Sequence, residues 1–283
     1  MICKENNCKE VEFMNREYLS EEINELIIPG IKNFVKNSGS KGVVLGISGG
    51  IDSAVVAALS VKALGDYWVK GVYMPCKSNM DDDYSEEEKQ DKEDAINLSK
   101  WLGIEMSILD LTTPYMVFRH RVNLANGTPT GTHGEISQSA CGNMKARMRM
   151  TALYALKEDL NYLCIGTGNL TEIELGYYTK YGDGGVDFEP IGKYYKTEVK
   201  TIADILGIKE SVPSIFTKSP SARLSPGQTD ERDIGASYDD IDYVLMCISN
   251  QINIPDHLTE LGNKIINRIS KNIHKRYAPP IIS

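Results

Sequence analysis

Cysteines and long apolar runs are both scarce in this sequence. Six cysteines are spread over 283 residues, with no Cys-x-x-Cys pair and no histidines beside them at metal-ligand spacing. The polar start MICKENNCKEVEF lacks the apolar centre of a signal peptide, and the longest apolar runs are shorter than a membrane span. These absences exclude a disulfide framework and a cysteine zinc site. We expect reduced thiols in a cytoplasmic protein that has no membrane partner.

Positive charge is also in short supply. The chain carries 31 Lys and Arg against 39 Asp and Glu, which gives a net charge of -8 and a pI near 5.2. Nucleic-acid binding rests on basic residues that displace counterions, so this balance argues against a nucleic-acid partner. A small anionic ligand needs only a few local cations and is compatible with the composition.

The length suits one large α/β domain, which we predict over residues 1–283. Within it we expect a flexible N-terminus over 1–16 and a C-terminal helix and tail over 255–283. Hydrophobic patterns of strand and helix type alternate along the chain. The predicted strands are 42–48, 69–74, 105–111 and 162–168, and the predicted helices are 17–37, 51–64, 85–102 and 143–160.

This alternation predicts a doubly wound, Rossmann-like parallel sheet flanked by helices, with its ligand at the carboxyl ends of the strands. Pro29 is expected to kink the first helix. The acidic run at 81–94 is interpreted as a solvated loop and helix face, and 123–143 as an irregular stretch that includes a surface histidine, His133.

The segment LGISGGIDSAVVAAL (45–59) is the most specific local signal. Its glycines and serines lie between a buried strand and a helix, so backbone N–H groups and hydroxyls converge there at the positive end of the helix dipole. The lysine of the common phosphate loop is missing, and Asp52 lies near its place. An acidic group beside bound phosphates indicates a magnesium ion, which prefers oxygen ligands.

The SGGIDS stretch resembles the pyrophosphate loop of the ATP pyrophosphatase group, whose members share an adenine nucleotide alpha-hydrolase-like fold. Further segments resemble NAD synthetases in order and spacing, from about residue 20 to the C-terminus. They are NMKARMRMTALY (143–154), GTGNLTE (166–172), LGYYTKYGDGGVDFEPIGKYYKTEV (175–199), KSPSARLSPGQTDERDIGASYDDIDYVL (218–245) and HKR (274–276). The resemblance implies amidation of deamido-NAD through an acyl-adenylate, giving NAD, AMP and pyrophosphate, by a homodimer. Helices 17–37 and 143–160 are candidates for the dimer surface.

About forty residues precede the loop, too few for an amidase domain of roughly 100–200 residues, so the implied nitrogen donor is free ammonia. The same resemblance assigns the ATP and metal residues. Asp52 and Glu172 match the magnesium ligands, and Lys196 matches the lysine that grips the ATP phosphates. The implied ATP site comprises Gly46, Ile47, Ser48, Gly49, Gly50, Ile51, Asp52, Ser53, Thr167, Lys196 and Ser221. Its TGN trio at 167–169 departs from the trio common in the family.

The deamido-NAD site implied by the resemblance consists of Arg147, Lys180, Asp183, Asp187, His274 and Lys275. Arg149 lies two residues from Arg147 and is expected on another helix face, where an ion-pair role is the alternative to ligand binding. Catalysis is assigned to Asp52, Lys196 and Asp187, with Asp187 orienting or deprotonating the ammonium ion.

Two other functions stay open from sequence. A tRNA-modifying enzyme would share the loop, but its basic face and reactive cysteine pair are not apparent. A nucleotide-binding sensor without activity would keep the same phosphate and metal residues, and only an assay separates it from an enzyme.

Overall fold

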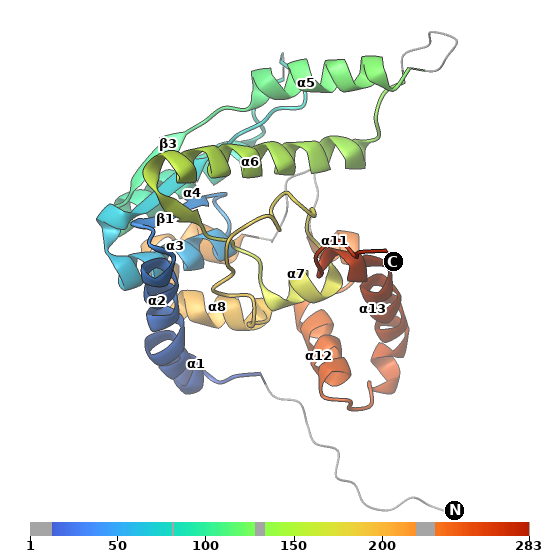
Figure 1. Ribbon diagram of the computed structural model, residues 1–283. Helices are drawn as coiled ribbons and strands as arrows, with labels where there is room; N and C mark the ends of the chain where they lie inside the picture. The colour runs from blue at the N-terminus through green and yellow to red at the C-terminus, as the bar shows by residue number, and fades with distance from the viewer. Residues whose placement is uncertain (1–12, 81, 128–133, 219–229, 283) are drawn as a thin grey trace, which may run out of the picture.

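The computed structural model describes residues 13–80, 82–127, 134–218 and 230–282 (Figure 1). In these ranges four strands form one parallel sheet in the order β3-β2-β1-β4. The strands are β1 (Gly42–Gly46), β2 (Val69–Tyr73), β3 (Glu105–Ile108) and β4 (Tyr162–Cys164). Val43 of β1 lies opposite both Val69 and Leu163. The predicted doubly wound parallel sheet is confirmed.

Helices cover both faces of this sheet. They are α1 (Arg16–Glu22), α2 (Ile28–Ser38), α3 (Ile51–Leu64), α4 (Glu86–Leu102), α5 (Thr112–Ala125), α6 (Gln138–Leu160), α7 (Leu170–Leu175), α8 (Lys196–Ile205), α9 (Ile208–Ser211), α10 (Pro213–Thr217), α11 (Asp230–Ile234), α12 (Tyr238–Ser249) and α13 (Thr259–Asn272). Single turns of 3-10 helix occupy 66–68, 256–258 and 273–275. Among the described helices, none has both the length and the apolar character required to cross a bilayer.

Alternate residues of β1 face two separate cores, as expected for a strand buried on both sides. Val43 and Leu45 join the larger core with apolar side chains of α1 to α4 and α8. Val44 points the other way, into a core with Tyr115 of α5 and Met144 of α6. In Figure 1, α5 and α6 accordingly lie together on one side of the sheet.

The predicted helix at 17–37 forms as α1 and α2 with an irregular turn before its proline. A π-helical segment, Ile23–Ile27, joins α1 to α2, and Pro29 lies in the first turn of α2. Pro29 has no N–H to donate within this continuous helical run, and the wider π turn before it accommodates the missing hydrogen bond. Its buried apolar residues, including Leu19 and Ile31, pack inside the chain.

Two further expectations differ from the structure. Helix α5 was not predicted, and the stretch interpreted as irregular is helical at both ends, because α5 runs to Ala125 and α6 begins at Gln138. Part of the acidic run is not solvated, because Asp91 and Asp94 of α4 are buried. The predicted flexible N-terminus lies largely outside the described residues, but Phe13 packs edge-on against Tyr195, and the Met14 N–H donates to Glu198 at 3.1 Å.

A third apolar core holds the C-terminal helices against α7. Its buried members include Leu175 of α7, Ile241 and Leu245 of α12, and Ile265 of α13. This core places α13 and the turn after it beside the segment that follows β4 (Figure 1). The C-terminal part of the chain is thereby brought to the carboxyl edge of the sheet.

Candidate functional site

A cavity of about 890 Å³ opens at the carboxyl ends of the strands. It lies where a parallel sheet with this topology presents its loops. The sequence-predicted residues that line it are Gly46, Ile47, Ser48, Gly50, Ile51, Asp52, Ser53, Thr167, Glu172, Asp183, Asp187, Lys196 and Lys275. Gly49, Arg147, Lys180 and His274 do not line it, and Ser221 and His133 lie outside the described residues.

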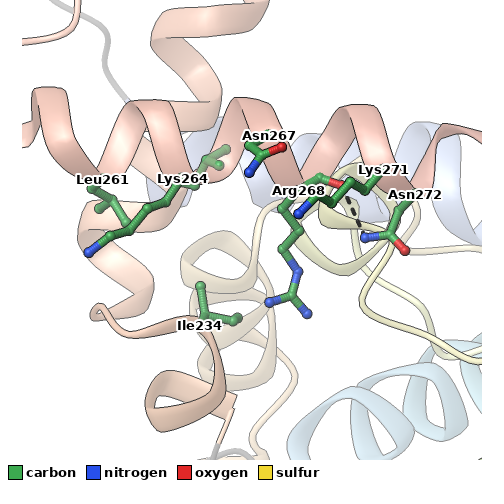
Figure 2. Close-up of a pocket in the computed structure, with 8 residues that line it drawn as sticks. Ile234, Leu261, Lys264, Asn267, Arg268, Lys271 and Asn272 are labelled. Atoms are coloured by element: carbon green, nitrogen blue, oxygen red, sulfur yellow. Dashed lines mark hydrogen bonds between the residues drawn. The ribbon is translucent and has the colours of Figure 1, made fainter.

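A second, smaller cavity of about 330 Å³ lies between α11 and α13 (Figure 2). Arg268 and Asn272 line both cavities, so one stretch of α13 separates them. The guanidinium of Arg268 lies 5.0 Å from the ring centre of Tyr177. Asn272 contacts Gly176, where an added Cβ would lie 2.3 Å from the Asn272 Cβ. This close approach docks α13 onto the end of α7.

The loop at 46–53 forms a cradle of polar groups at the start of α3. The Gly50 N–H donates to the Ser48 hydroxyl at 3.2 Å, and the Ser53 hydroxyl donates to the Gly50 carbonyl at 3.0 Å. Gly49 has φ +80°, and an added Cβ there would lie 2.4 Å from the Asp91 carbonyl oxygen. In the part of the chain that the structure describes, no side-chain hydrogen bond caps α3 at Gly50, and its first residues Ile51, Asp52 and Ser53 line the cavity, so an anion is the complementary ligand.

An ion pair joins this cradle to α8. Lys196 Nζ donates to Asp52 Oδ2, and Asn169 Nδ2 donates to Asp52 Oδ1 at 3.0 Å. Lys196 is buried, with 6% of its surface exposed. The ammonium group therefore lies at the cavity wall beside the loop, where it can meet a phosphate.

Glu172 enters the cavity from the first turn of α7. Asn169 and Glu172 form a capping box: the Glu172 N–H donates to Asn169 Oδ1 at 3.0 Å, and the Asn169 N–H donates to Glu172 Oε2 at 3.2 Å. Asn169 therefore contacts both Asp52 and Glu172, and holds the two predicted metal-binding carboxylates on one wall.

A buried carboxylate of α12 accepts hydrogen bonds from the first turns of α7 and α8. Asp242 is fully buried; it accepts from the Thr171 hydroxyl, and its Oδ2 accepts from the Thr197 N–H at 2.9 Å. Thr171 in turn accepts from the Lys196 N–H at 3.0 Å. Burial raises the pKa of Asp242 to about 6 against these hydrogen bonds. Asp242 thus fixes the residues next to Glu172 and Lys196, and sequence reasoning missed it.

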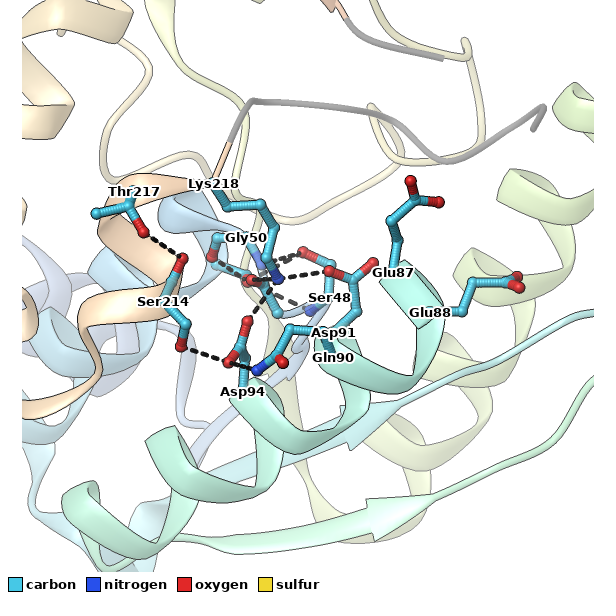
Figure 3. A network of polar contacts seen from close by, with 12 residues as sticks. Ser48, Gly50, Glu87, Glu88, Gln90, Asp91, Asp94, Ser214, Thr217 and Lys218 are labelled. Carbon is cyan, nitrogen blue, oxygen red and sulfur yellow. Dashed lines mark hydrogen bonds and ion pairs between the residues drawn. The ribbon is translucent and has the colours of Figure 1, made fainter. Parts of the chain in front are cut away.

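Lys218 ties the acidic helix α4 to the phosphate loop (Figure 3). Its ammonium donates to Asp91 Oδ1 and Asp94 Oδ2, each at 2.5 Å, and to the Gly49 carbonyl at 3.1 Å. Burial works to raise the pKa of Asp94, but hydrogen bonds from Lys218, Ser214 and other donors outweigh it, and the pKa is lowered. The buried acids of the 81–94 run therefore fix the loop that was expected to hold phosphate.

The residues assigned to the dinucleotide fall into two groups. Lys275 lines the cavity, and its ammonium donates to the carbonyls of Gly176 and Tyr178 at 2.6 and 2.7 Å. Asp183 and Asp187 line it too, whereas Arg147, Lys180 and His274 form a chain outside the cavity. Arg147 Nε donates to the Lys180 carbonyl at 3.3 Å, and Lys180 Nζ donates to the His274 carbonyl at 2.6 Å.

Arg149 is the arginine of α6 that lines the cavity, and its Nε donates to the Met74 carbonyl at 3.0 Å. Within the described residues no carboxylate pairs with it, so the ion-pair role considered from sequence is not observed. Its spacing from Arg147 placed it on another face, and that face is the one turned to the cavity.

The Asp187 carboxylate is surrounded by donors. Lys157 Nζ donates to it at 2.9 and 3.1 Å, the Tyr154 hydroxyl at 3.2 Å, and the Cys164 N–H at 2.7 Å. These contacts join the 183–188 segment to α6 and to the end of β4. The ion pair with Lys157 and the two other donors hold the carboxylate in place, which supports a positioning role for this residue.

Asp183 and Glu189 flank Asp187 at the same wall. Asp183 Oδ1 accepts from the Thr179 N–H at 3.0 Å and lines the cavity. Glu189 also lines the cavity, and sequence reasoning did not single it out. Its signal was only an acidic residue within an otherwise apolar FEPI stretch.

Comparison with known proteins gives one family over nearly the whole chain. A family profile described as NAD synthase matches residues 23–279. The NH(3)-dependent NAD(+) synthetase of Methanosarcina mazei is 45% identical over 92% of this chain and 97% of its own length. That of Archaeoglobus fulgidus is 41% identical over 92% of this chain and 96% of its own.

Solved structures agree with the sequence relatives. NMN synthetase from Francisella tularensis superposes with a TM-score of 0.77 at 29% identity, over 95% of this chain and 99% of its own. An NH3-dependent NAD synthetase from Campylobacter jejuni, solved with a nitrate ion, has a TM-score of 0.71 at 29% identity, over 95% of this chain and 100% of its own.

Proposed function

The chain belongs to the NAD synthase family of ligases, and on this premise we propose that it amidates deamido-NAD with ammonia in an ATP-driven reaction. The products are NAD, AMP and pyrophosphate. The observation that carries the proposal is the convergence of the SGGIDS loop, the Asp52–Lys196 pair and Glu172 at one cavity wall. The names of the curated relatives support ammonia as the nitrogen donor.

In this proposal the ATP phosphates lie in the cradle of residues 46–53. The free N–H groups at the start of α3 and the helix dipole favour the anion. Lys196 contributes the positive charge for the departing pyrophosphate, and Thr167 contributes a hydroxyl from the end of β4. Ser221, assigned to the same ligand, lies outside the described residues.

Asp52 and Glu172 would hold Mg²⁺. Two carboxylates that share Asn169 as a hydrogen-bond donor and face one cavity suit an ion that binds one or two carboxylates together with substrate phosphates. Each carboxylate keeps lone pairs beyond those hydrogen bonds. When bound, the ion supplies charge neutralisation to the phosphates.

Deamido-NAD is proposed to extend from the cavity toward the C-terminal turn. Asp183, Asp187 and Lys275 line the inner part of this path, and Arg147, Lys180 and His274 are joined by hydrogen bonds farther out. The positive charges of Arg147, Lys180 and Lys275 suit a ligand with a pyrophosphate and a free carboxylate. Arg149, from the same helix, adds a cation to the cavity wall.

The reaction then needs positioning more than covalent chemistry from the protein. The nicotinate carboxylate attacks the α-phosphorus, and the bond to pyrophosphate breaks while Lys196 and the loop N–H groups hold the departing charge. Ammonia next attacks the carbonyl carbon of the acyl-adenylate, and AMP leaves. Asp187 keeps the 183–188 segment against α6 through Lys157 and against β4 through Cys164.

The deciding experiment measures NAD, AMP and pyrophosphate from ATP, Mg²⁺ and deamido-NAD, with ammonium or glutamine as donor. We expect equal amounts of the three products with ammonium and none with glutamine. A parallel reaction with nicotinate mononucleotide in place of deamido-NAD tests whether the chain makes NMN, as the name of the similar NMN synthetase suggests. Folded protein that binds ATP but makes no amide from either substrate would instead be a nucleotide sensor.

We also propose a homodimer in a reducing, cytoplasmic setting. Val117 and Phe118 of α5 are 59% and 54% exposed, and apolar side chains of this size favour a partner surface. The 17–37 segment, considered from sequence, packs its main apolar stripe inside the chain but also exposes Tyr18, Leu26 and Phe34, so it stays a candidate for this surface. The four described cysteines are free thiols, as expected under reducing conditions.

A further inference from the structure

Glu189 occupies a space left by two glycines that follow β4. An added Cβ on Gly166 would lie 2.2 Å from Glu189 Oε2, and one on Gly168 would lie 3.0 Å from Oε1. The Gly168 N–H donates to Oε2 at 2.9 Å. The GTG sequence at 166–168 therefore makes room for this carboxyl and holds one of its oxygens, while no hydrogen bond is recorded to Oε1 from the described residues.

The surroundings of Glu189 are acidic or uncharged among the described residues. The ionisable groups that face it are Asp183, Tyr178 and Cys164, and among the described residues no lysine or arginine pairs with it. Asp187, two residues away, differs because it forms an ion pair with Lys157. Burial raises the pKa of Glu189 from 4.5 to about 8, with the Gly168 N–H working against the shift and Asp183 adding to it.

We propose that the Glu189 carboxylate binds the ammonium ion and accepts the proton that must leave before nitrogen attacks the acyl-adenylate. This inference rests on the proposed function, because it assigns a residue to the ammonia half of that reaction. A small cation is complementary to two neighbouring carboxyls without a paired base. A proton acceptor works best when its affinity for the proton matches the working pH.

One N–H bond of ammonium breaks, and its proton goes to Glu189 Oε1. The freed lone pair forms the C–N bond at the carbonyl carbon. A second proton leaves the adduct to solvent, and the C–O bond to AMP breaks with its electron pair on the phosphate oxygen. Glu189 then returns its proton to solvent.

The test is the Glu189→Gln variant, which keeps the size of the side chain and removes its proton affinity. Initial rates of NAD formation are measured against ammonium concentration, below and above pH 8. Deamido-NAD-dependent exchange of labelled pyrophosphate into ATP reports the adenylation half alone. We expect kcat/KM for ammonium to fall by about 10²-fold while exchange and the KM for ATP stay near wild type. The deficit should shrink at high pH, where free ammonia is abundant.

Two further variants sharpen the result. Glu189→Asp should recover part of the activity because it restores a carboxylate. Glu174→Gln is the matched control: its carboxyl pKa is also raised by burial, but it does not line the cavity, and its ammonium kinetics should be unchanged.

The proposal is overturned if Glu189→Gln keeps the wild-type KM for ammonium and the wild-type pH profile. It is equally overturned if that variant loses pyrophosphate exchange, because Glu189 would then act in adenylation or in folding. Failure of the proposed function looks different: the wild-type protein itself would show no exchange with deamido-NAD.

Discussion

The Lys196 ammonium and the Asp52 carboxylate form an ion pair between residues 144 positions apart in sequence. Asp52 lies in the first turn of α3, and Lys196 is the first residue of α8, so the pair joins two helix starts at the cavity. The side chains are only 7% and 18% exposed. A buried pair of this kind fixes geometry more than it adds stability. In the proposed reaction, this ion pair opens when the ligands bind: Lys196 then contacts the ATP phosphates, and Asp52 would hold the metal ion.

Lys196→Met should reduce NAD formation by roughly 10²–10³-fold, because one charged donor to the departing pyrophosphate is lost. Steady-state rates with saturating ammonium measure the effect. Lys89→Ala is the control, since Lys89 is exposed and forms its ion pair with Glu86 at the start of α4, away from Lys196. A Lys196 variant with near wild-type rates would remove this residue from the phosphate site.

Gly49→Ala should destabilise the protein and weaken ATP binding. Its left-handed φ alone costs about 1–2 kcal/mol for a residue with a Cβ, and the clash with the Asp91 carbonyl adds to this. Gly30→Ala is the matched control, because nothing lies within 4 Å of its added Cβ, and alanine there favours α2. Urea unfolding and ATP titration of both variants decide the point. Equal stability of the two would contradict the tight loop geometry.

Lys218→Met should lower the free energy of unfolding by about 3–5 kcal/mol, because Asp91 and Asp94 would be left buried without their cation. The KM for ATP should rise as well, since the Gly49 carbonyl loses its donor. Adding Asp94→Asn to Lys218→Met should recover part of the lost stability. If the double variant is no more stable than the single one, the charges are not coupled.

The pH dependence of stability should reveal Asp242. Its folded pKa is raised to about 6 from 3.8, so the folded state holds the proton more tightly than the unfolded chain. The associated stability is fully present below pH 3.8 and is lost as pH rises through about 6, by up to about 3 kcal/mol. Comparing wild type with Asp242→Asn by urea unfolding across this range isolates the contribution of the Asp242 carboxyl to the free energy of unfolding. A constant difference between them would contradict it.

Phe118→Asp should convert the proposed dimer to a monomer with little loss of fold stability, because the side chain is exposed within one chain. Sedimentation at several protein concentrations measures the change. Tyr67→Asp is a matched control, since Tyr67 is also exposed, at 79%, but lies away from α5. Dissociation by the Tyr67 change, or none by the Phe118 change, would place the interface elsewhere.

Local pattern was sufficient for the sheet and for α3, whose predicted bounds 51–64 match the structure. Buried strands read as apolar runs, and the glycine break set the helix start. Helix α5 was missed because Val117 and Phe118 face outward, so its apolar residues follow no single buried stripe. The burial of Asp94 was equally invisible, since its partner Lys218 lies 124 residues away.

The same distinction holds for the site. Asp52 and the loop carry their chemistry in a short motif, so sequence alone located them. Asp242 acts through Thr171, 71 residues earlier, and Glu189 through Gly168, 21 residues earlier. Neither has a local signature, because an isolated Asp or Glu most often lies on a solvated surface.

The most direct test of the central claim follows oxygen from substrate to product. Deamido-NAD carrying a heavy oxygen isotope in its nicotinate carboxylate is converted with ATP and ammonium, and the products are examined by mass spectrometry. Attack of that carboxylate on the α-phosphorus predicts one labelled oxygen in AMP and none in pyrophosphate. Label in inorganic phosphate with ADP as co-product, or unlabelled AMP, would contradict the acyl-adenylate route at this cavity.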